Sequence, residues 1–181
     1  MAALMTLEEV ADYLRVTRKT IYRLVEKRAI PSTRVGHQWR FDREAVEAWL
    51  RQNSSGVAAK VLVIDDEETV CELFRDTLEG AGHSVMTAVD AITGLKLAKE
   101  EDVNLVFLDL KMPVMDGAEV FKEIRASKPS LPVTIITGFA ESELMASAMQ
   151  GGPFGVMKKP FTPADILTVV ATYLHTSPSA R

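Results

Sequence analysis

The sequence is poor in cysteine and in long apolar segments. Its 181 residues include one cysteine, Cys71, which cannot form a disulfide within the chain, so a reducing cytoplasm is the expected location. No apolar run approaches the roughly 18 residues that a membrane-spanning helix needs, and no membrane partner is expected. The first residues also lack the basic and apolar segments of a secretory signal.

Several catalytic signatures are missing as well. There is no Gly-x-x-x-x-Gly-Lys-Ser/Thr phosphate loop. The three histidines, His37, His83 and His175, are far apart in the sequence, and Cys71 has no metal-ligand neighbour. No Ser/His/Asp or Cys/His arrangement is present. We therefore expect no output enzyme in this chain.

Charge is unevenly distributed along the chain. Its 25 acidic and 21 basic residues give a net charge of −4. Residues 1–52 contain ten basic and seven acidic residues, a net charge of +3, which leaves eleven basic and eighteen acidic residues, or −7, for the rest. Residues 15–40 contain eight basic residues and a single acidic one, Glu26. This asymmetry predicts two domains with different partners.

The domain boundary is predicted in a short polar stretch. Residues 53–59 contain small and polar side chains without an amphipathic period, which is typical of a flexible linker. We expect a first domain at 1–52, a second at 60–176, and a C-terminal tail at 177–181.

The second domain alternates between short apolar runs and segments with helical spacing. Five strands and five helices in alternation predict an α/β fold with a doubly wound, five-stranded parallel sheet. The predicted strands are 61–64, 84–89, 105–108, 133–136 and 154–157, and the predicted helices are 67–80, 90–100, 117–127, 141–150 and 163–174.

Polar residues follow four of these predicted strands. In an open parallel sheet, ligands bind beyond the carboxyl ends of the strands, where the strand order reverses. The residues at those ends are Asp65, Asp66, Asp109, Thr137 and Lys159. Clustered carboxylates repel one another unless a cation joins them, and all-oxygen ligands with free positions suit Mg²⁺. With the metal ion and a lysine to offset charge, Asp109 could attack phosphorus as a nucleophile.

These residues lie within longer motifs of a known family. The segments are Val-Leu-Val-Ile-Asp65-Asp66-Glu, Leu-Val-Phe-Leu-Asp109-Leu-Lys-Met-Pro113-Val-Met-Asp116-Gly117, Ile-Ile-Thr137-Gly and Lys159-Pro160-Phe161. Together they make residues 60–175 resemble response-regulator receiver domains, which have a flavodoxin-like fold.

The resemblance implies a role for each site residue. Asp109 would accept a phosphoryl group from a histidine kinase, Thr137 would be the switch hydroxyl, and Lys159 would pair with the phosphoryl group. Asp66, Asp109 and the main-chain carbonyl of Lys111 would ligate Mg²⁺, with Asp65 acting mainly through a metal-bound water. The Lys159–Pro160 peptide would be cis. A degenerate receiver that is never phosphorylated is the alternative.

One position departs from the family pattern. Receivers usually have an aromatic residue three positions before the lysine of the Lys-Pro pair, and this chain has Val156 there. Phe154 is two residues earlier, which predicts the same face of the strand. Our hypothesis is that Phe154 partly replaces the missing aromatic residue.

The first domain is predicted to be smaller and mainly helical. Thr6 and Glu9 have the spacing of a capping box that opens a helix over 7–14, and Thr17 is a candidate N-cap for a helix over 18–28. Residues 35–41 alternate in polarity, so we expect Arg34 and Arg40 on one face of a hairpin, opposite Val35, Trp39 and Phe41. Asp42 is the predicted cap of a last helix.

The second helix and the hairpin are the candidate DNA-binding surface. Basic side chains at the start of such a helix can reach base edges, and those of a wing can hold the flanking backbone. The candidate contacts are Arg18, Lys19, Thr20, Tyr22, Arg23, Lys27, Arg34, His37, Gln38 and Arg40. Residues 4–51 resemble the excisionase-like (MerR-related) winged helix-turn-helix. A solvated basic face, or a protein-binding use of this scaffold, is the alternative.

Taken together, the two resemblances predict a two-component response regulator that controls transcription. Phosphorylation would bias a two-state receiver, and its altered face would pair with a second copy to give a homodimer. Two small winged domains bind DNA better than one, which predicts an operator with two half-sites. The rival hypothesis is a phosphorelay or protein-interaction adaptor.

Overall fold

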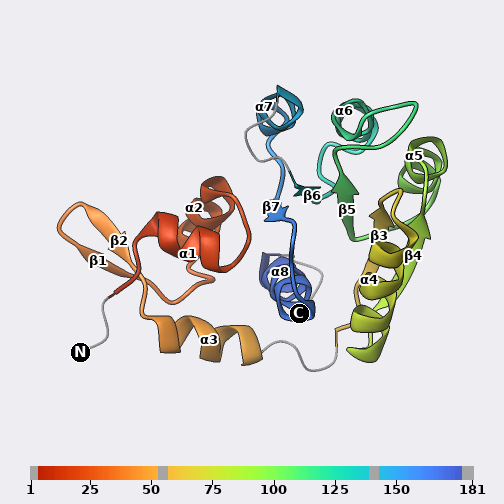
Figure 1. The fold of residues 1–181 in the computed structure, drawn as a ribbon. Coiled ribbons are helices and arrows are strands. Elements are labelled where there is room, and N and C mark those ends of the chain that lie inside the picture. Colours follow the sequence, from red (N-terminus) through yellow and green to blue (C-terminus); the bar gives the residue numbers. More distant parts are fainter. Residues whose placement is uncertain (1–3, 53–56, 139–142, 177–181) are drawn as a thin grey trace.

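The computed structural model describes residues 4–52, 57–138 and 143–176, and it contains two units (Figure 1). Most of the predicted linker, residues 141–142 of the predicted fourth receiver helix, and the predicted tail lie outside the described residues. Within the described segments, no helix combines the length and the apolar character that crossing a membrane requires.

The N-terminal unit contains three helices, and each of the first two begins at its predicted cap. Helix α1 spans Leu7–Tyr13 and α2 spans Arg18–Glu26, two residues shorter than predicted. The Thr6 hydroxyl accepts a hydrogen bond from the Glu9 backbone N–H at 3.1 Å, and the Glu9 carboxylate accepts one from the Thr6 N–H at 2.6 Å. This completes the predicted capping box. Helix α3 spans Arg43–Gln52.

The hairpin lies between α2 and α3, and its faces differ from the prediction. Strands β1 (Thr33–Val35) and β2 (Gln38–Arg40) pair so that Arg34 lies opposite Trp39. Directly opposed residues share a face, and the Arg34 guanidinium lies 5.8 Å from the centroid of the Trp39 ring. The prediction that Arg34 and Arg40 share a face was therefore wrong, because the two-residue turn between the strands interrupts the alternation.

The C-terminal unit is the predicted α/β fold, with a five-stranded parallel sheet in the order β4-β3-β5-β6-β7. Each parallel strand is followed by a helix, as crossover connections require. The elements are β3 (Lys60–Ile64), α4 (Glu68–Gly80), β4 (Ser84–Ala88), α5 (Ala91–Glu100), β5 (Leu105–Asp109), α6 (Gly117–Ser127), β6 (Val133–Thr137), α7 (Glu143–Gln150), β7 (Gly155–Lys158) and α8 (Pro163–Thr176).

Helices cover both faces of the sheet, and one of the two resulting cores continues into the N-terminal unit. Helices α4 and α8 pack on one face, and α5, α6 and α7 pack on the other (Figure 1). The core under α4 and α8 forms one apolar cluster with Leu14, Ile21 and Trp49 of the N-terminal unit. The two units are thus joined by apolar packing as well as by the chain.

Candidate functional site

The predicted site residues converge at the carboxyl edge of the sheet. Asp65 follows β3, Asp109 ends β5, Thr137 ends β6, and Lys159 follows β7. Asp65, Asp109 and Thr137 are buried, with at most 4% of each residue exposed. Four segments that are distant in the sequence thus deliver one hydroxyl, one ammonium and two buried carboxylates to the same edge.

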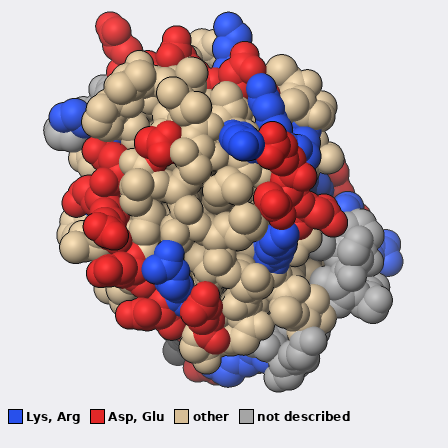
Figure 2. All heavy atoms as spheres, turned by 90° about the vertical axis from the view of Figure 1, so that its right-hand side faces the viewer, with Lys and Arg blue, Asp and Glu red and all other residues tan. Residues whose placement is uncertain are grey.

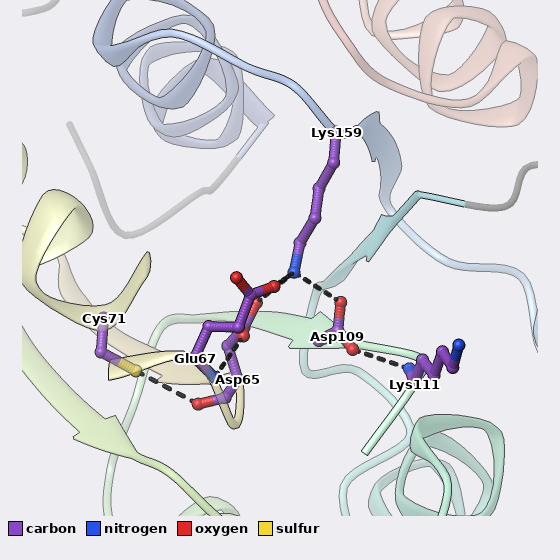
Figure 3. Close-up of polar contacts among 6 residues, drawn as sticks. All are labelled: Asp65, Glu67, Cys71, Asp109, Lys111 and Lys159. Carbon is purple, nitrogen blue, oxygen red and sulfur yellow. Dashed lines mark hydrogen bonds and ion pairs between the residues drawn. The ribbon is translucent and has the colours of Figure 1, made fainter. Parts of the chain in front are cut away.

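The Lys159 ammonium holds this cluster together (Figure 3). Its Nζ lies 3.1 Å from a carboxylate oxygen of Asp65 and 3.1 Å from one of Asp109. The same nitrogen donates a hydrogen bond to Glu67 Oε1 at 2.8 Å. One cation therefore contacts three carboxylates. Such pairing is what buried charges require, because isolation from water strongly disfavours an unpaired charge.

Backbone donors fix the other oxygens of the two buried carboxylates. The Glu67 N–H donates to Asp65 Oδ1 at 2.9 Å, and the Lys111 N–H donates to Asp109 Oδ2 at 2.7 Å (Figure 3). A carboxylate held from both sides has little freedom to rotate. Asp109 is thus presented in a defined orientation before any partner binds, which is a condition for efficient nucleophilic attack.

Burial also changes the proton affinity of the cluster. It raises the pKa of Asp65 to about 6, with a further contribution from the nearby Asp109, and it raises the pKa of Asp109. Burial alone would lower the pKa of Lys159, but its contacts with Glu67, Asp65 and Asp109 outweigh this effect and raise it. The ammonium therefore stays charged, and a second cation at the site would stabilise both aspartates in their ionised form.

The donor set fits a hard divalent cation. Asp65 Oδ2 is buried and lies 3.1 Å from Lys159 Nζ, but it accepts no hydrogen bond of good geometry from the described residues. Asp66 is solvent-exposed, and its charge contributes to the raised pKa of Asp109. Within the described residues, no three acidic, histidine or cysteine side chains lie close enough together to hold a metal ion by themselves, so main-chain oxygens or waters would have to complete a metal site. Carboxylate oxygens beside open solvent match Mg²⁺, which retains several waters.

The Asp116-Gly117 pair supports the site without entering it. The Asp116 carboxylate accepts a hydrogen bond from the Glu119 N–H at 2.9 Å and so caps α6. A Cβ at Gly117 would collide with the backbone carbonyl oxygen of Asp109. Glycine is therefore required for α6 to begin this close to the end of β5.

The segment around β7 confirms one prediction and overturns another. The Lys159–Pro160 peptide is cis, and the Lys159 N–H donates to the Thr137 carbonyl at 2.9 Å. Phe154, however, belongs to the core under α4 and α8, whereas Val156 packs against the core on the opposite side of the sheet. Strand β7 begins at Gly155, so the alternation does not reach Phe154. The expectation that Phe154 shares a face with Val156 was wrong, and the replacement hypothesis loses its basis.

One residue of this cluster was missed by the sequence analysis. Glu67 was not among the candidate site residues, yet its carboxylate lies 2.8 Å from Lys159 Nζ, closer than those of Asp65 and Asp109, and that contact lowers the pKa of Glu67. Its position directly after Asp65-Asp66 was the available signal.

Most of the predicted DNA contacts are exposed. These are Arg18, Lys19, Tyr22, Arg23, Lys27, Arg34, His37 and Gln38, while Arg40 is partly exposed. Thr20 differs from its prediction as an exposed residue: it is only 4% exposed, and its hydroxyl donates to the Phe154 carbonyl at 2.8 Å. The receiver unit, not solvent, faces this part of α2.

Figure 2 shows the side of α4 and α5, where acidic side chains gather along the margins, basic side chains lie among them, and uncharged side chains lie between.

Comparisons with known proteins agree with both parts of this description. Residues 61–171 match the family model of the response regulator receiver domain, and residues 4–54 match that of a helix-turn-helix domain. Among solved structures, the receiver domain of NtrX from Brucella abortus is 34% identical, with a TM-score of 0.60 over 65% of this chain and 99% of that one. A CheY-like receiver domain protein from Methanospirillum hungatei is 27% identical, with a TM-score of 0.60 over 63% and 91%.

Curated relatives match a little over half of this chain. The alkaline phosphatase synthesis transcriptional regulatory protein PhoP of Bacillus subtilis is 36% identical over 65% of this chain and 49% of its own length. The transcriptional regulatory protein GlrR of Escherichia coli is 36% identical over 56% of this chain and 23% of its own length. The chain thus spans half or less of these relatives. It belongs to the response regulator receiver domain family and carries a helix-turn-helix domain before the receiver.

Proposed function

We propose that this chain is a two-component response regulator in which phosphorylation of Asp109 controls DNA binding and transcription. The observation that carries the proposal is the buried pair Asp65 and Asp109, joined by one ammonium at the carboxyl edge of the sheet. The exposed Asp66 and the partly exposed Lys159 leave the cluster open on that side.

The transfer step follows from this geometry. A carboxylate oxygen of Asp109 forms a bond to phosphorus while the P–N bond of a phosphohistidine breaks, and the histidine nitrogen takes back the electron pair. The product is an acyl phosphate on Asp109. Lys159 stabilises the charge on the phosphoryl oxygens, and the Thr137 hydroxyl is positioned at the neighbouring strand end to donate to one of them.

Residues at the same edge would hold Mg²⁺. Asp66, Asp109 and the Lys111 carbonyl would supply oxygen ligands, and Asp65 would contribute through an intervening water. When bound, the metal ion offsets negative charge on the carboxylates and on the incoming phosphoryl group. The role of the chain is to orient Asp109, through the Lys111 N–H and the Lys159 ammonium, toward the phosphodonor.

The N-terminal unit would supply the output. Helix α2 and the hairpin present Arg18, Lys19, Arg23 and Arg34 on a unit with a net positive charge. This fits an operator of two half-sites bound by two copies, with a histidine kinase as phosphodonor in the cytoplasm. The chain would act as a phosphoryl acceptor rather than as an output enzyme.

The decisive experiment is selection from a random duplex DNA pool with Mg²⁺ alone and with Mg²⁺ plus beryllofluoride. We expect an enriched motif whose recovery changes with beryllofluoride in the wild type but not in Asp109→Asn. The matched control is Asp76→Asn, an exposed carboxylate of α4, which should behave as the wild type. Failure to enrich any motif in either state would refute the proposed DNA binding and favour a protein partner for the N-terminal unit.

A further inference from the structure

The two units meet at one end of the receiver sheet, where α1 and α2 lie beside β7 (Figure 1). Val16, in the turn between these helices, forms an antiparallel bridge with Gly155 of β7, and the Thr17 N–H donates to the Phe154 carbonyl at 3.0 Å. A Cβ at Gly155 would collide with the Arg15 carbonyl oxygen. Arg15 has a φ of 55°, in the left-handed region that non-glycine residues seldom adopt. The backbones of the two units are therefore in direct contact.

Beside this contact the two units leave a cavity of about 600 Å³ between them. Helix α1, the turn and the start of α2 line one side, and the end of α7, residues 152–153 and β7 line the other. Cavities of roughly 300–1,000 Å³ are typical of small-molecule sites, which occur preferentially between domains. The direct backbone contact holds the walls together, so a ligand would meet a preformed site.

Five apolar side chains line the cavity, and we call them the apolar floor: Ala11, Val16, Met149, Pro153 and Val156. Val156 is at the position where receiver domains usually have an aromatic residue, so a larger side chain there would extend into the cavity. An apolar cavity of about 150 Å³ is enough to hold benzene. Met149 is 44% exposed and can adapt its flexible thioether to an aromatic ring. The apolar floor therefore suits a flat ring.

The charged side chains around the cavity favour an anion. Arg15 is paired with Asp165 at 3.1 Å, and Arg18 is paired with Glu8 at 3.3 Å. In the part of the chain that the structure describes, no ion pair involves the other three charged lining residues, which are Lys19, Lys158 and Asp12. Two cations and one anion are thus left to interact with a bound molecule, and the balance is positive.

Both of these lysines lie next to the apolar floor. Lys19 Nζ is 3.6 Å from the position that a Cβ at Gly152 would take, which places this ammonium at the receiver wall of the cavity. Lys158 follows Val156 by two residues in β7, and residues two apart in a strand point to the same face. An ammonium from each unit can therefore reach a negative group whose apolar part covers Val156.

We propose that this cavity binds a small aromatic carboxylic acid. The ring covers the apolar floor at Val156, and the carboxylate pairs with the ammonium groups of Lys19 and Lys158. An inorganic anion would leave the apolar floor uncovered, whereas an uncharged ring would leave both ammonium groups without a partner. The binding is reversible and requires neither DNA nor phosphoryl transfer, so the inference goes beyond the proposed function and does not depend on it.

The test is isothermal titration calorimetry of the full chain, without DNA or a phosphodonor. The probes are naphthoate, which has a ring and a carboxylate, naphthalenemethanol, which has the ring alone, and acetate, which has the carboxylate alone. We expect naphthoate to bind one-to-one and about tenfold more tightly than naphthalenemethanol, because only the acid pairs with the lysines. Acetate should show no saturable binding over the same concentrations.

One pair of variants tests the apolar floor. Val156→Phe places a ring of the protein in the cavity and should weaken the binding of naphthoate by about tenfold, since the ring of the ligand loses its buried position. The matched control is Val89→Phe at a valine that is 50% exposed and does not line the cavity. Its affinity for naphthoate should equal that of the wild type.

A second pair of variants tests the charges and keeps the proposal falsifiable if Val156→Phe folds poorly. The double variant Lys19→Gln and Lys158→Gln should bind naphthoate about tenfold more weakly than the wild type and leave the affinity for naphthalenemethanol unchanged. The control is the double variant Lys96→Gln and Lys122→Gln, which makes the same change of charge at two exposed lysines outside the cavity.

Three results would overturn the proposal. They are no saturable binding of naphthoate to the wild type, undiminished binding to a folded Val156→Phe variant, and equal binding to the two double-lysine variants. Each result would leave the proposed phosphorylation and DNA binding standing, because neither takes part in the assay.

Discussion

The receiver and the helix-turn-helix unit differ in how complete their functional surfaces are. The receiver site is assembled within one unit: Lys159 forms ion pairs with the buried Asp65 and Asp109 at the strand ends. The predicted DNA surface is divided, because Thr20 is bound by the receiver while Arg23 is exposed. The comparison teaches that the proposed acceptor site is formed within the receiver alone, whereas the proposed DNA-binding surface depends on how the two units pack against each other.

The largest expected effect concerns whether the two units unfold as one. Leu14→Ala removes a fully buried side chain from the shared core and should lower the free energy of unfolding by about 2–5 kcal/mol. Both tryptophans are in the N-terminal unit, so their fluorescence follows that unit while far-UV circular dichroism follows the whole chain. We expect the two signals to coincide for the wild type and to separate for Leu14→Ala.

The matched control for that measurement is Leu167→Ala, a partly exposed position on α8. Its cost should stay within about 0.5 kcal/mol, as for most surface substitutions. Two separate transitions in the wild type would show that the shared core does not couple the units.

The next effect isolates the receiver site. Lys159→Ala removes the cation that contacts Asp65 and Asp109, and it should slow phosphorylation by a small-molecule phosphodonor about 10²-fold, the scale on which a lost charge-stabilising group acts. Initial rates can be followed by intact-protein mass spectrometry in the presence of Mg²⁺. The control, Lys96→Ala, changes an exposed lysine of α5. Equal rates for the two variants would contradict the role assigned to Lys159.

A smaller effect isolates the output surface. On a selected DNA site, Arg23→Ala should weaken binding by about 1–3 kcal/mol if the guanidinium contacts a base, and the affinity of the wild type should fall steeply with salt. Fluorescence anisotropy over a range of salt concentrations measures both. Lys96→Ala is again the control, since it leaves the N-terminal unit unchanged. An Arg23→Ala variant with wild-type affinity would remove Arg23 from the interface.

The smallest effect concerns acid pH. Burial lowers the pKa of His175, although hydrogen bonds to the backbone of Leu50 and Trp49 partly oppose this shift. With α8 packed against α3, the chain therefore binds fewer protons than it would with the two units separated, and this packing should weaken as the pH falls below about 6.5, by less than about 1.4 kcal/mol per pH unit. The hydrogen-exchange protection of the backbone amides of residues 14–21 should decrease between pH 7 and pH 5.5.

His175→Phe keeps an aromatic ring against Trp49 but cannot take up a proton. This variant should therefore lose much of the pH dependence. If its protection decreases with acid as much as that of the wild type, another group is responsible.

The sequence was most informative where one local pattern decides the structure. The receiver strands and their carboxyl ends were predictable, because apolar runs mark the strands and parallel strands deliver their ends to one edge. The capping box at Thr6 was predictable for the same local reason. These features require no knowledge of what packs against them.

The incorrect predictions involve turns and contacts between distant segments. The alternating pattern that predicted a shared face for Arg34 and Arg40 is interrupted by the two-residue turn. The pattern that predicted a shared face for Phe154 and Val156 is wrong because β7 starts at Gly155. Thr20 has the polarity and position of an exposed residue, and only the approach of β7 buries it. The close contact between β7 and the turn before α2 depends on the positive φ of Arg15 and on the missing side chain of Gly155. A periodic pattern of polar and apolar residues cannot predict such a contact.

The place of β7 at the end of the sheet has a consequence for solubility. An uncovered sheet edge is a template on which another chain can add a strand, and natural proteins keep such edges short or covered. Here the helix-turn-helix turn covers the start of β7. Separation of the two units would expose this edge for the addition of a strand from another chain, so the contact at the start of β7 also protects the protein against self-association.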